Sequence, residues 1–244
     1  MMERFALEVH GLSKRFGGLM AVDNLSFSVR HNEVLGLIGP NGSGKTTTMN
    51  LISGALKPTD GDVLLGDRLI SGRPMRTIAR LGVARTFQLV RVLPSLSLIE
   101  NVMAGAAFGN KRFWGRELIR YSERLLARVG LENRIGAPTS SLTYIDEKRL
   151  ELARALASDP QLLLLDEWLA GLNPTELTTG IDLIKSLRDE GRTIILVEHV
   201  MDAIRSLCGS CVVMNSGAKI AEGNTHKVLS NPEVVKAYLG DDDA

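Results

Sequence analysis

The spacing of hydrophobic residues along the chain changes in a regular order. Residues 5–9 and 22–30 alternate apolar with polar side chains, which predicts half-buried strands. Residues 34–38 are continuously apolar and end at Gly39, as expected of a strand buried on both faces. Helical spacing follows over residues 45–55. The first part of the chain is therefore predicted to form half-buried strands, then a buried strand that leads into a helix.

The same alternation returns in the second half of the chain. Apolar runs over 161–165 and 193–197 predict two buried strands, with a helix over 175–190 between them. The stretch 95–157 carries helical spacing almost throughout. The other predicted elements are strands at 63–66, 211–214 and 218–221 and helices at 74–81, 115–129, 144–157 and 231–238. Because strands alternate with helices, we expect an α/β fold with a mostly parallel sheet, interrupted by an inserted helical subdomain.

Composition removes several classes of protein from consideration. The 244 residues are 44% hydrophobic and 23% charged, which is enough chain for a sizeable core. The 29 Lys and Arg nearly balance 28 Asp and Glu, so the chain lacks the basic excess of a nucleic-acid binder. No apolar run approaches the roughly 18 residues of a membrane span, and the first residues do not resemble a signal peptide. We expect a cytosolic chain that reaches a membrane only through a partner.

Two cysteines form a C-x-x-C pair, a spacing shared by redox and zinc motifs. Cys208 and Cys211 have no second pair elsewhere, and the four histidines are scattered along the chain. Cys211 also begins an apolar run that is typical of a buried strand. We therefore interpret both cysteines as reduced residues near the start of a strand.

A glycine-rich loop between a predicted strand and a predicted helix carries the strongest chemical signal. Residues 39–46 match the pattern G-x-x-x-x-G-K-[ST], whose glycines let the backbone wrap a phosphate. The N-terminus of the following helix adds a favourable dipole. Lys45 is expected to reach the β- and γ-phosphates and the Thr46 hydroxyl to ligate Mg²⁺. The predicted nucleotide-binding residues of this loop are Gly39, Pro40, Asn41, Gly42, Ser43, Gly44, Lys45, Thr46 and Thr47.

Acidic residues follow the buried strand predicted over 161–165. Asp166 comes at its carboxyl end, where open α/β sheets bind ligands, and suits the coordination shell of Mg²⁺. Glu167 could polarise an attacking water as a general base. The next buried strand ends beside His199, which can contact the γ-phosphate or order that water. Each of these residues is common at strand ends for structural reasons, but together with the phosphate loop they predict a catalytic centre.

The ordered set of motifs resembles the nucleotide-binding subunit of an ATP-binding cassette (ABC) transporter over nearly the whole chain. His199 is similar to the switch histidine of that family, and Gln88, in Arg-Thr-Phe-Gln, to the glutamine that links Mg²⁺ and the attacking water to the helical subdomain. Phe16 resembles the aromatic residue that stacks on adenine. The resemblance implies that ATP and Mg²⁺ are the cofactors, with Gln88 joining Thr46 and Asp166 in the metal site.

The resemblance also implies the organisation of the chain. Residues 1–244 would form one ABC ATPase domain with a P-loop NTPase (RecA-like) core and an N-terminal antiparallel β subdomain. That core would comprise residues 1–87 and 158–244, and residues 88–157 would form the inserted helical subdomain. Within the family, the ending Asn-Pro-Glu-Val-Val-Lys-Ala-Tyr-Leu-Gly (231–240) and the Ala-Gly-Leu-Asn-Pro segment (170–174) look most like branched-chain amino acid importers. Urea and amide importers share much of this pattern.

Two positions depart from the family pattern. The signature segment, typically Leu-Ser-Gly-Gly-Gln, would cap the ATP of a second subunit through backbone N–H groups. Here Ile145 stands where glycine is expected, so its side chain would obstruct close approach, and Asp146 would add negative charge near phosphate. Trp168 follows Glu167 where proline is usual. Either these changes impair one composite site or they are tolerated. The segment consists of Leu142, Thr143, Tyr144, Ile145 and Asp146.

We therefore expect the ATP-hydrolysing subunit of an importer, peripheral to the cytoplasmic face of the plasma membrane. Its partners would be transmembrane permease subunits, a second ATP-binding subunit and, indirectly, a solute-binding protein, but no nucleic acid. A P-loop kinase or small GTPase would share the phosphate loop without needing the set formed by Gln88, 142–146 and His199. A soluble cassette of DNA repair or translation would need a coiled-coil insert or a second cassette. A regulatory cassette with weak hydrolysis is the remaining alternative.

Overall fold

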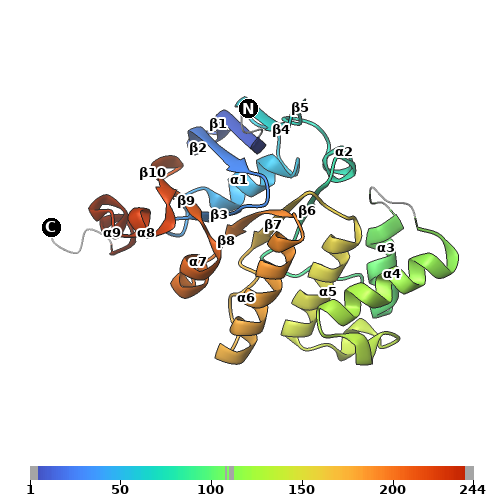
Figure 1. Cartoon of the computed structure of the whole chain (residues 1–244). Coiled ribbons are helices and arrows are strands. Elements are labelled where there is room, and N and C mark those ends of the chain that lie inside the picture. The colour runs from blue at the N-terminus through green and yellow to red at the C-terminus, as the bar shows by residue number, and fades with distance from the viewer. Residues whose placement is uncertain (1–4, 108, 110–112, 240–244) are drawn as a thin grey trace. The chain divides into compact units, whose positions relative to one another are not determined.

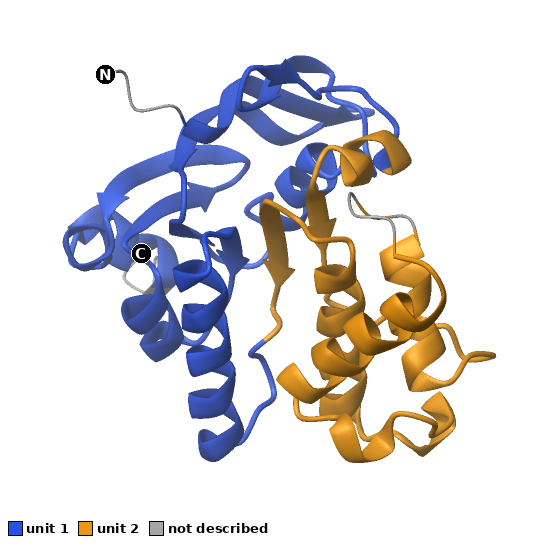
Figure 2. Ribbon diagram, turned by 45° about the vertical axis from the view of Figure 1, so that its right-hand side comes forward, with its two compact units in different colours: residues 1–75, 169–244 blue, residues 76–168 orange. Residues whose placement is uncertain are grey.

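The computed structural model describes residues 5–107, 109 and 113–239 (Figure 1). Gly240 of the C-terminal motif lies outside these residues. The chain divides into two compact units (Figure 2). Unit 1 comprises residues 1–75 and 169–244, and unit 2 comprises residues 76–168.

The N-terminal part of unit 1 is an antiparallel sheet. It is built from β1 (Phe5–Phe16), β2 (Leu19–Arg30), β4 (Asp60–Leu65) and β5 (Arg68–Leu69), in the order β2-β1-β4-β5. Alternate residues such as Leu7, Val9 and Phe27 are buried, as the alternating sequence pattern predicts. The expected antiparallel β subdomain is therefore confirmed. The first strand continues past the predicted end at residue 9, because its polar second half still pairs with β2.

The rest of unit 1 contains a second group of strands. The apolar runs predicted as buried strands at 34–38, 193–197 and 211–214 pair in parallel here, as expected. Their order is β10-β9-β3-β8, with β3 parallel to both β8 and β9 and with β10 antiparallel to β9. Every residue of β3 and β8 is buried. The bounds are β3 (Val34–Ile38), β8 (Thr193–Val197), β9 (Ser210–Asn215) and β10 (Ala218–Asn224).

The helices of unit 1 include two that the sequence pattern did not predict. Three helices were predicted, and their ends lie one to three residues from the predicted ends or coincide with them: α1 (Lys45–Ile52), α6 (Pro174–Asp189) and α9 (Pro232–Leu239). The unpredicted helices are α7 (Met201–Leu207) and α8 (Thr225–Leu229), with seven and five residues. Such short segments carry too few apolar positions for a helical period to stand out.

Unit 2 combines two parallel strands with helices. The strand β7 (Leu162–Asp166) was predicted, whereas its neighbour β6 (Val83–Arg85) was not, because three residues show no period. The helices are α2 (Met75–Arg80), α3 (Leu98–Ala107), α4 (Gly115–Arg128) and α5 (Tyr144–Ala157), with 3₁₀ turns at Glu132–Arg134 and Thr139–Ser141. In the described parts of both units, no helix has the length and apolar character that a bilayer crossing requires.

Candidate functional site

The glycine-rich loop in unit 1 joins the end of β3 to the start of α1. Gly39 has φ 149° and Gly44 has φ 102°, values that favour glycine. A Cβ atom on Gly39 would lie 2.1 Å from the Met214 carbonyl oxygen, and one on Gly44 would lie 2.5 Å from the Ala21 carbonyl oxygen. The loop backbone can therefore pack this closely only because these positions carry no side chain.

Lys45 places a positive charge inside this loop. Its side chain is 5% exposed, and its Nζ atom donates hydrogen bonds to the carbonyl oxygens of Gly39 (2.8 Å) and Pro40 (2.9 Å). The nearby Ser43 hydroxyl is buried and has no hydrogen-bond partner among the described residues. The Thr46 side chain is exposed at the start of α1. A buried cation, an unpaired hydroxyl and a helix N-terminus together fit an anionic ligand.

His199 follows β8 and is exposed. Because β8 runs parallel to β3, His199 and the glycine-rich loop follow the carboxyl ends of neighbouring strands in unit 1. The preceding Glu198 is fully buried and accepts a 2.6 Å hydrogen bond from the Leu169 backbone N–H. Phe16 ends β1 with 44% of its surface exposed, and Lys14 Nζ lies 5.1 Å from its ring centroid.

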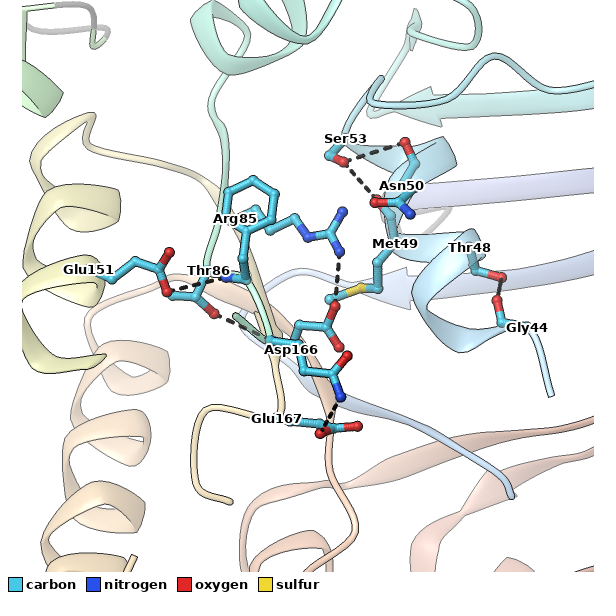
Figure 3. Close-up of polar contacts among 12 residues, drawn as sticks. Gly44, Thr48, Met49, Asn50, Ser53, Arg85, Thr86, Glu151, Asp166 and Glu167 are labelled. Carbon is cyan, nitrogen blue, oxygen red and sulfur yellow. Dashed lines mark hydrogen bonds and ion pairs between the residues drawn. The ribbon is translucent and has the colours of Figure 1, made fainter. Parts of the chain in front are cut away.

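In unit 2, Asp166 forms a buried ion pair that the sequence did not reveal. Its Oδ2 atom lies 2.9 Å from Arg85 Nη2, and the two side chains are 1% and 6% exposed (Figure 3). The Asp166 backbone N–H also donates to the Thr86 hydroxyl at 3.3 Å. Burial lowers the pKa of Arg85, while the neighbouring Asp166 charge opposes that shift. Arg85 belongs to the Arg-Thr-Phe-Gln motif, but its partner depends on β6 lying beside β7.

Two predicted catalytic residues meet in the same unit. The Nε2 atom of Gln88 donates a 3.0 Å hydrogen bond to Oε2 of Glu167. The loop that carries Gln88 is anchored by Glu151 of α5, which accepts hydrogen bonds from the backbone N–H groups of Phe87 (3.2 Å) and Arg91 (2.9 Å). Burial raises the pKa of Glu151, and these two hydrogen bonds oppose the shift. Glu151 was not singled out from the sequence, because a glutamate within a helix carries no local signal of this role.

The segment 142–146 forms the start of helix α5. The Thr143 hydroxyl caps the helix by accepting from the Asp146 backbone N–H at 3.3 Å. The Asp146 carboxylate lies 2.7 Å from Arg134 Nη1 and 3.6 Å from Arg149 Nη1, so its charge is balanced within unit 2. Ile145 is half-buried in the first turn and is not among the residues with positive φ. The backbone at position 145 therefore does not adopt the left-handed conformation for which glycine would be needed.

The cysteine pair is buried, as the sequence predicts. Cys208 and Cys211 are both free thiols, and Cys211 Sγ lies 3.2 Å from the Thr225 hydroxyl. The hydrogen bond to Cys211 and burial together raise the pKa of Cys208 well above its ordinary value. A Cβ atom on Gly36 of β3 would lie 2.8 Å from Cys211 Sγ. The two thiols thus pack against the strand that leads to the glycine-rich loop.

Comparison with known proteins assigns the family. A family model described as "ABC transporter" matches residues 22–170, and one described as "Branched-chain amino acid ATP-binding cassette transporter" matches residues 218–244. The chain is 40% identical to the high-affinity branched-chain amino acid transport ATP-binding protein LivG of Salmonella typhimurium, over 98% of this chain and 100% of that protein. It is 39% identical to BraF of Pseudomonas aeruginosa over the same shares of the two chains.

A solved structure supports the same assignment. The fold matches that of an ATP-binding cassette of an ABC transporter in its ADP conformation, with a TM-score of 0.87 and 29% sequence identity. The match covers 97% of this chain and 99% of that chain. The expected α/β fold of a P-loop NTPase is thereby confirmed. The chain belongs to the ABC transporter family, as one of its ATP-binding ATPase subunits.

Proposed function

We propose that this chain binds ATP through residues 39–47 and hydrolyses it to drive an importer of branched-chain amino acids. The observation that carries this proposal is the glycine-rich loop with Lys45 buried inside it. A triphosphate would replace the two carbonyl oxygens that Lys45 now contacts with more strongly attracting anionic oxygens. The exposed ring of Phe16 supplies an aromatic face for adenine.

The chain also offers oxygen donors that suit Mg²⁺. The Thr46 hydroxyl is exposed at the start of α1, and the Asp166 carboxylate ends β7. The side-chain amide of Gln88 supplies a further oxygen. Hard oxygen ligands of these kinds are those that Mg²⁺ prefers. When bound, the ion supplies positive charge to the phosphate oxygens.

Glu167 is the general base in this proposal. The Gln88 amide donates to its carboxylate at 3.0 Å, which restricts how the carboxylate can turn. So held, Glu167 orients a water and accepts its proton as the water attacks the γ-phosphorus, while the bond from that phosphorus to the β–γ bridging oxygen breaks and ADP leaves. Lys45 stabilises the charge that develops on the phosphate oxygens, and His199 contacts the γ-phosphate or the same water.

Membership of the ABC transporter family supports the partners that we propose. The helices between residues 88 and 157 dock on transmembrane permease subunits, and residues 142–146 complete the ATP site of a second ATP-binding subunit. The chain lies at the cytoplasmic face of the membrane, and a solute-binding protein acts on the other side of the permease. The likeness to LivG and BraF, together with the match over residues 218–244, supports branched-chain amino acids as the solute.

Two substitutions test the ATPase site. Lys45→Ala removes the cation of the loop and should weaken ATP binding, measured with a fluorescent ATP analogue. Glu167→Gln keeps the shape of the side chain but removes the carboxylate, so ATP should still bind while turnover falls by about 100-fold or more. Wild-type affinity in the first variant, or wild-type turnover in the second, would contradict the assigned roles.

Matched controls lie on the surface of the same chain. Lys227→Ala and Glu132→Gln make the same chemical changes at exposed positions, so both variants should bind and hydrolyse ATP like the wild type. The solute is tested separately, by uptake of labelled leucine and of urea into vesicles that contain the assembled transporter. Uptake of urea without leucine would reassign the solute and leave the ATPase site unaffected.

A further inference from the structure

Glu167 has an unusual backbone conformation for a long side chain. Its φ is 52°, in the left-handed region. The other non-glycine residues with positive φ in the described part of the chain are two asparagines, an aspartate and a serine, which are residue types with short polar side chains. Such a conformation costs free energy in a glutamate and persists only where surrounding contacts hold it. The contacts around this peptide therefore decide where the Glu167 carboxylate points.

A buried lysine from helix α5 makes those contacts. Lys148 is 3% exposed, and its Nζ atom donates hydrogen bonds to the carbonyl oxygens of Glu167 (3.0 Å) and Trp168 (3.3 Å). The same ammonium lies 5.0 Å from the ring centroid of Tyr144, one helical turn earlier. Hydrogen bonds from an ionised donor are stronger than those between neutral groups. Lys148 thus holds two successive carbonyl groups at the end of strand β7.

Trp168 makes a hydrogen bond back to Lys148. Its indole Nε1–H donates a 3.0 Å hydrogen bond to the backbone carbonyl oxygen of Lys148, and the side chain is 4% exposed. The backbone of each residue therefore accepts a hydrogen bond from the side chain of the other. Proline, the usual residue after the acidic pair in this family, has no side-chain donor and could not make the second bond.

We propose that Lys148 and Trp168 are positioning residues for Glu167. They hold its peptide in the left-handed conformation, which aims the carboxylate at Gln88, and they connect that geometry to helix α5. Because α5 begins with the segment 142–146, a shift of this helix would alter the orientation of Glu167. The tryptophan at position 168 therefore supports the catalytic geometry. This inference rests on the proposed catalytic role of Glu167.

The test combines substitutions at 148 and 168 with Glu167→Gln in the assembled transporter. Lys148→Met keeps the length of the side chain but removes the donors, and should lower single-turnover hydrolysis by about 10-fold, since small misplacements of catalytic groups are costly. ATP affinity should stay within about 2-fold, because Lys148 lies outside the proposed phosphate-binding residues. Lys148→Arg restores charged donors and should recover part of the rate.

Trp168→Phe removes the indole N–H and keeps an aromatic ring, so the expected loss is smaller, about 3-fold. The matched control is Trp114→Phe, which makes the same change at a residue that is 75% exposed and should leave the rate unchanged. In the full chain measured without its partners, which has two tryptophans, this control also assigns the two indole NMR signals. The Trp168 indole proton should exchange slowly with solvent in the wild type and faster in Lys148→Met.

The double variant with Glu167→Gln separates positioning from general destabilisation. If Lys148 acts through the Glu167 carboxylate, Lys148→Met should cause no further loss of single-turnover rate once that carboxylate is gone. An equal loss in both backgrounds would overturn the inference, as would a wild-type rate in both Lys148→Met and Trp168→Phe. If Lys148→Met does not fold, Trp168→Phe takes its place in the same comparison. Wild-type turnover in Glu167→Gln alone would instead refute the proposed role of Glu167.

Discussion

Replacing Arg85 by methionine should destabilise the chain more than any surface substitution. The Arg85 guanidinium lies 2.9 Å from the Asp166 carboxylate, and both side chains are at most 6% exposed. Methionine keeps much of the apolar volume of the side chain but leaves a buried carboxylate without this cation. Removing one partner of a buried ion pair typically costs about 3–5 kcal/mol of unfolding free energy. For a chain of this size, that loss corresponds to a decrease in Tm of about 6–20 °C.

A double-mutant cycle tests whether the loss of this cation beside the Asp166 carboxylate causes the destabilisation. Asp166→Asn removes the charge, so the double variant Arg85→Met/Asp166→Asn should be less destabilised than the sum of the single variants. The expected coupling is about 1–3 kcal/mol, measured by urea denaturation. Arg120→Met is the control, because Arg120 is exposed on α4 and should tolerate the change. An Arg85→Met variant that melts within about 2 °C of the wild type, or strictly additive losses, would refute the reasoning.

Three further perturbations have defined outcomes. Ile145→Gly should lower the unfolding free energy by only about 1 kcal/mol, because Ile145 is half-buried in the first turn of α5. A loss of several kcal/mol in urea denaturation would instead mean that Ile145 belongs to the core. Gly36→Ala should cost about 1–3 kcal/mol by overpacking against Cys211 Sγ, and Cys211→Ala should recover part of this loss in the same assay. Burial raises the pKa of Tyr238 from its ordinary value of about 10 to about 12, so the stability that its neutral form contributes is present below pH 10 and lost as pH rises towards 12. Thermal melting of the wild type and Tyr238→Phe across this range should show a larger decrease for the wild type, and parallel curves would contradict it.

The sequence alone determined the features that depend on residues close together along the chain. The buried strands β3, β7 and β8 are apolar runs with clear ends, and α5 and α6 carry enough turns for their periods to be visible. The glycine-rich loop was recognised from its spacing, because the loop conformation demands glycine at set positions. Its chemistry is contained in eight consecutive residues, so no distant contact is needed to predict it.

Only the tertiary structure decided which distant side chains meet. The pairing of Arg85 with Asp166 requires the three-residue strand β6 to lie beside β7, and the anchoring of the Gln88 loop requires Glu151 of α5 to face it. The hydrogen bond from Lys148 Nζ to the Glu167 carbonyl oxygen likewise joins residues 19 positions apart. Such contacts follow from how elements pack, and packing depends on the whole arrangement of the unit rather than on any local period. For this reason the sequence indicated which residues we propose to carry the chemistry, whereas the residues that hold them in place became visible only in the structure.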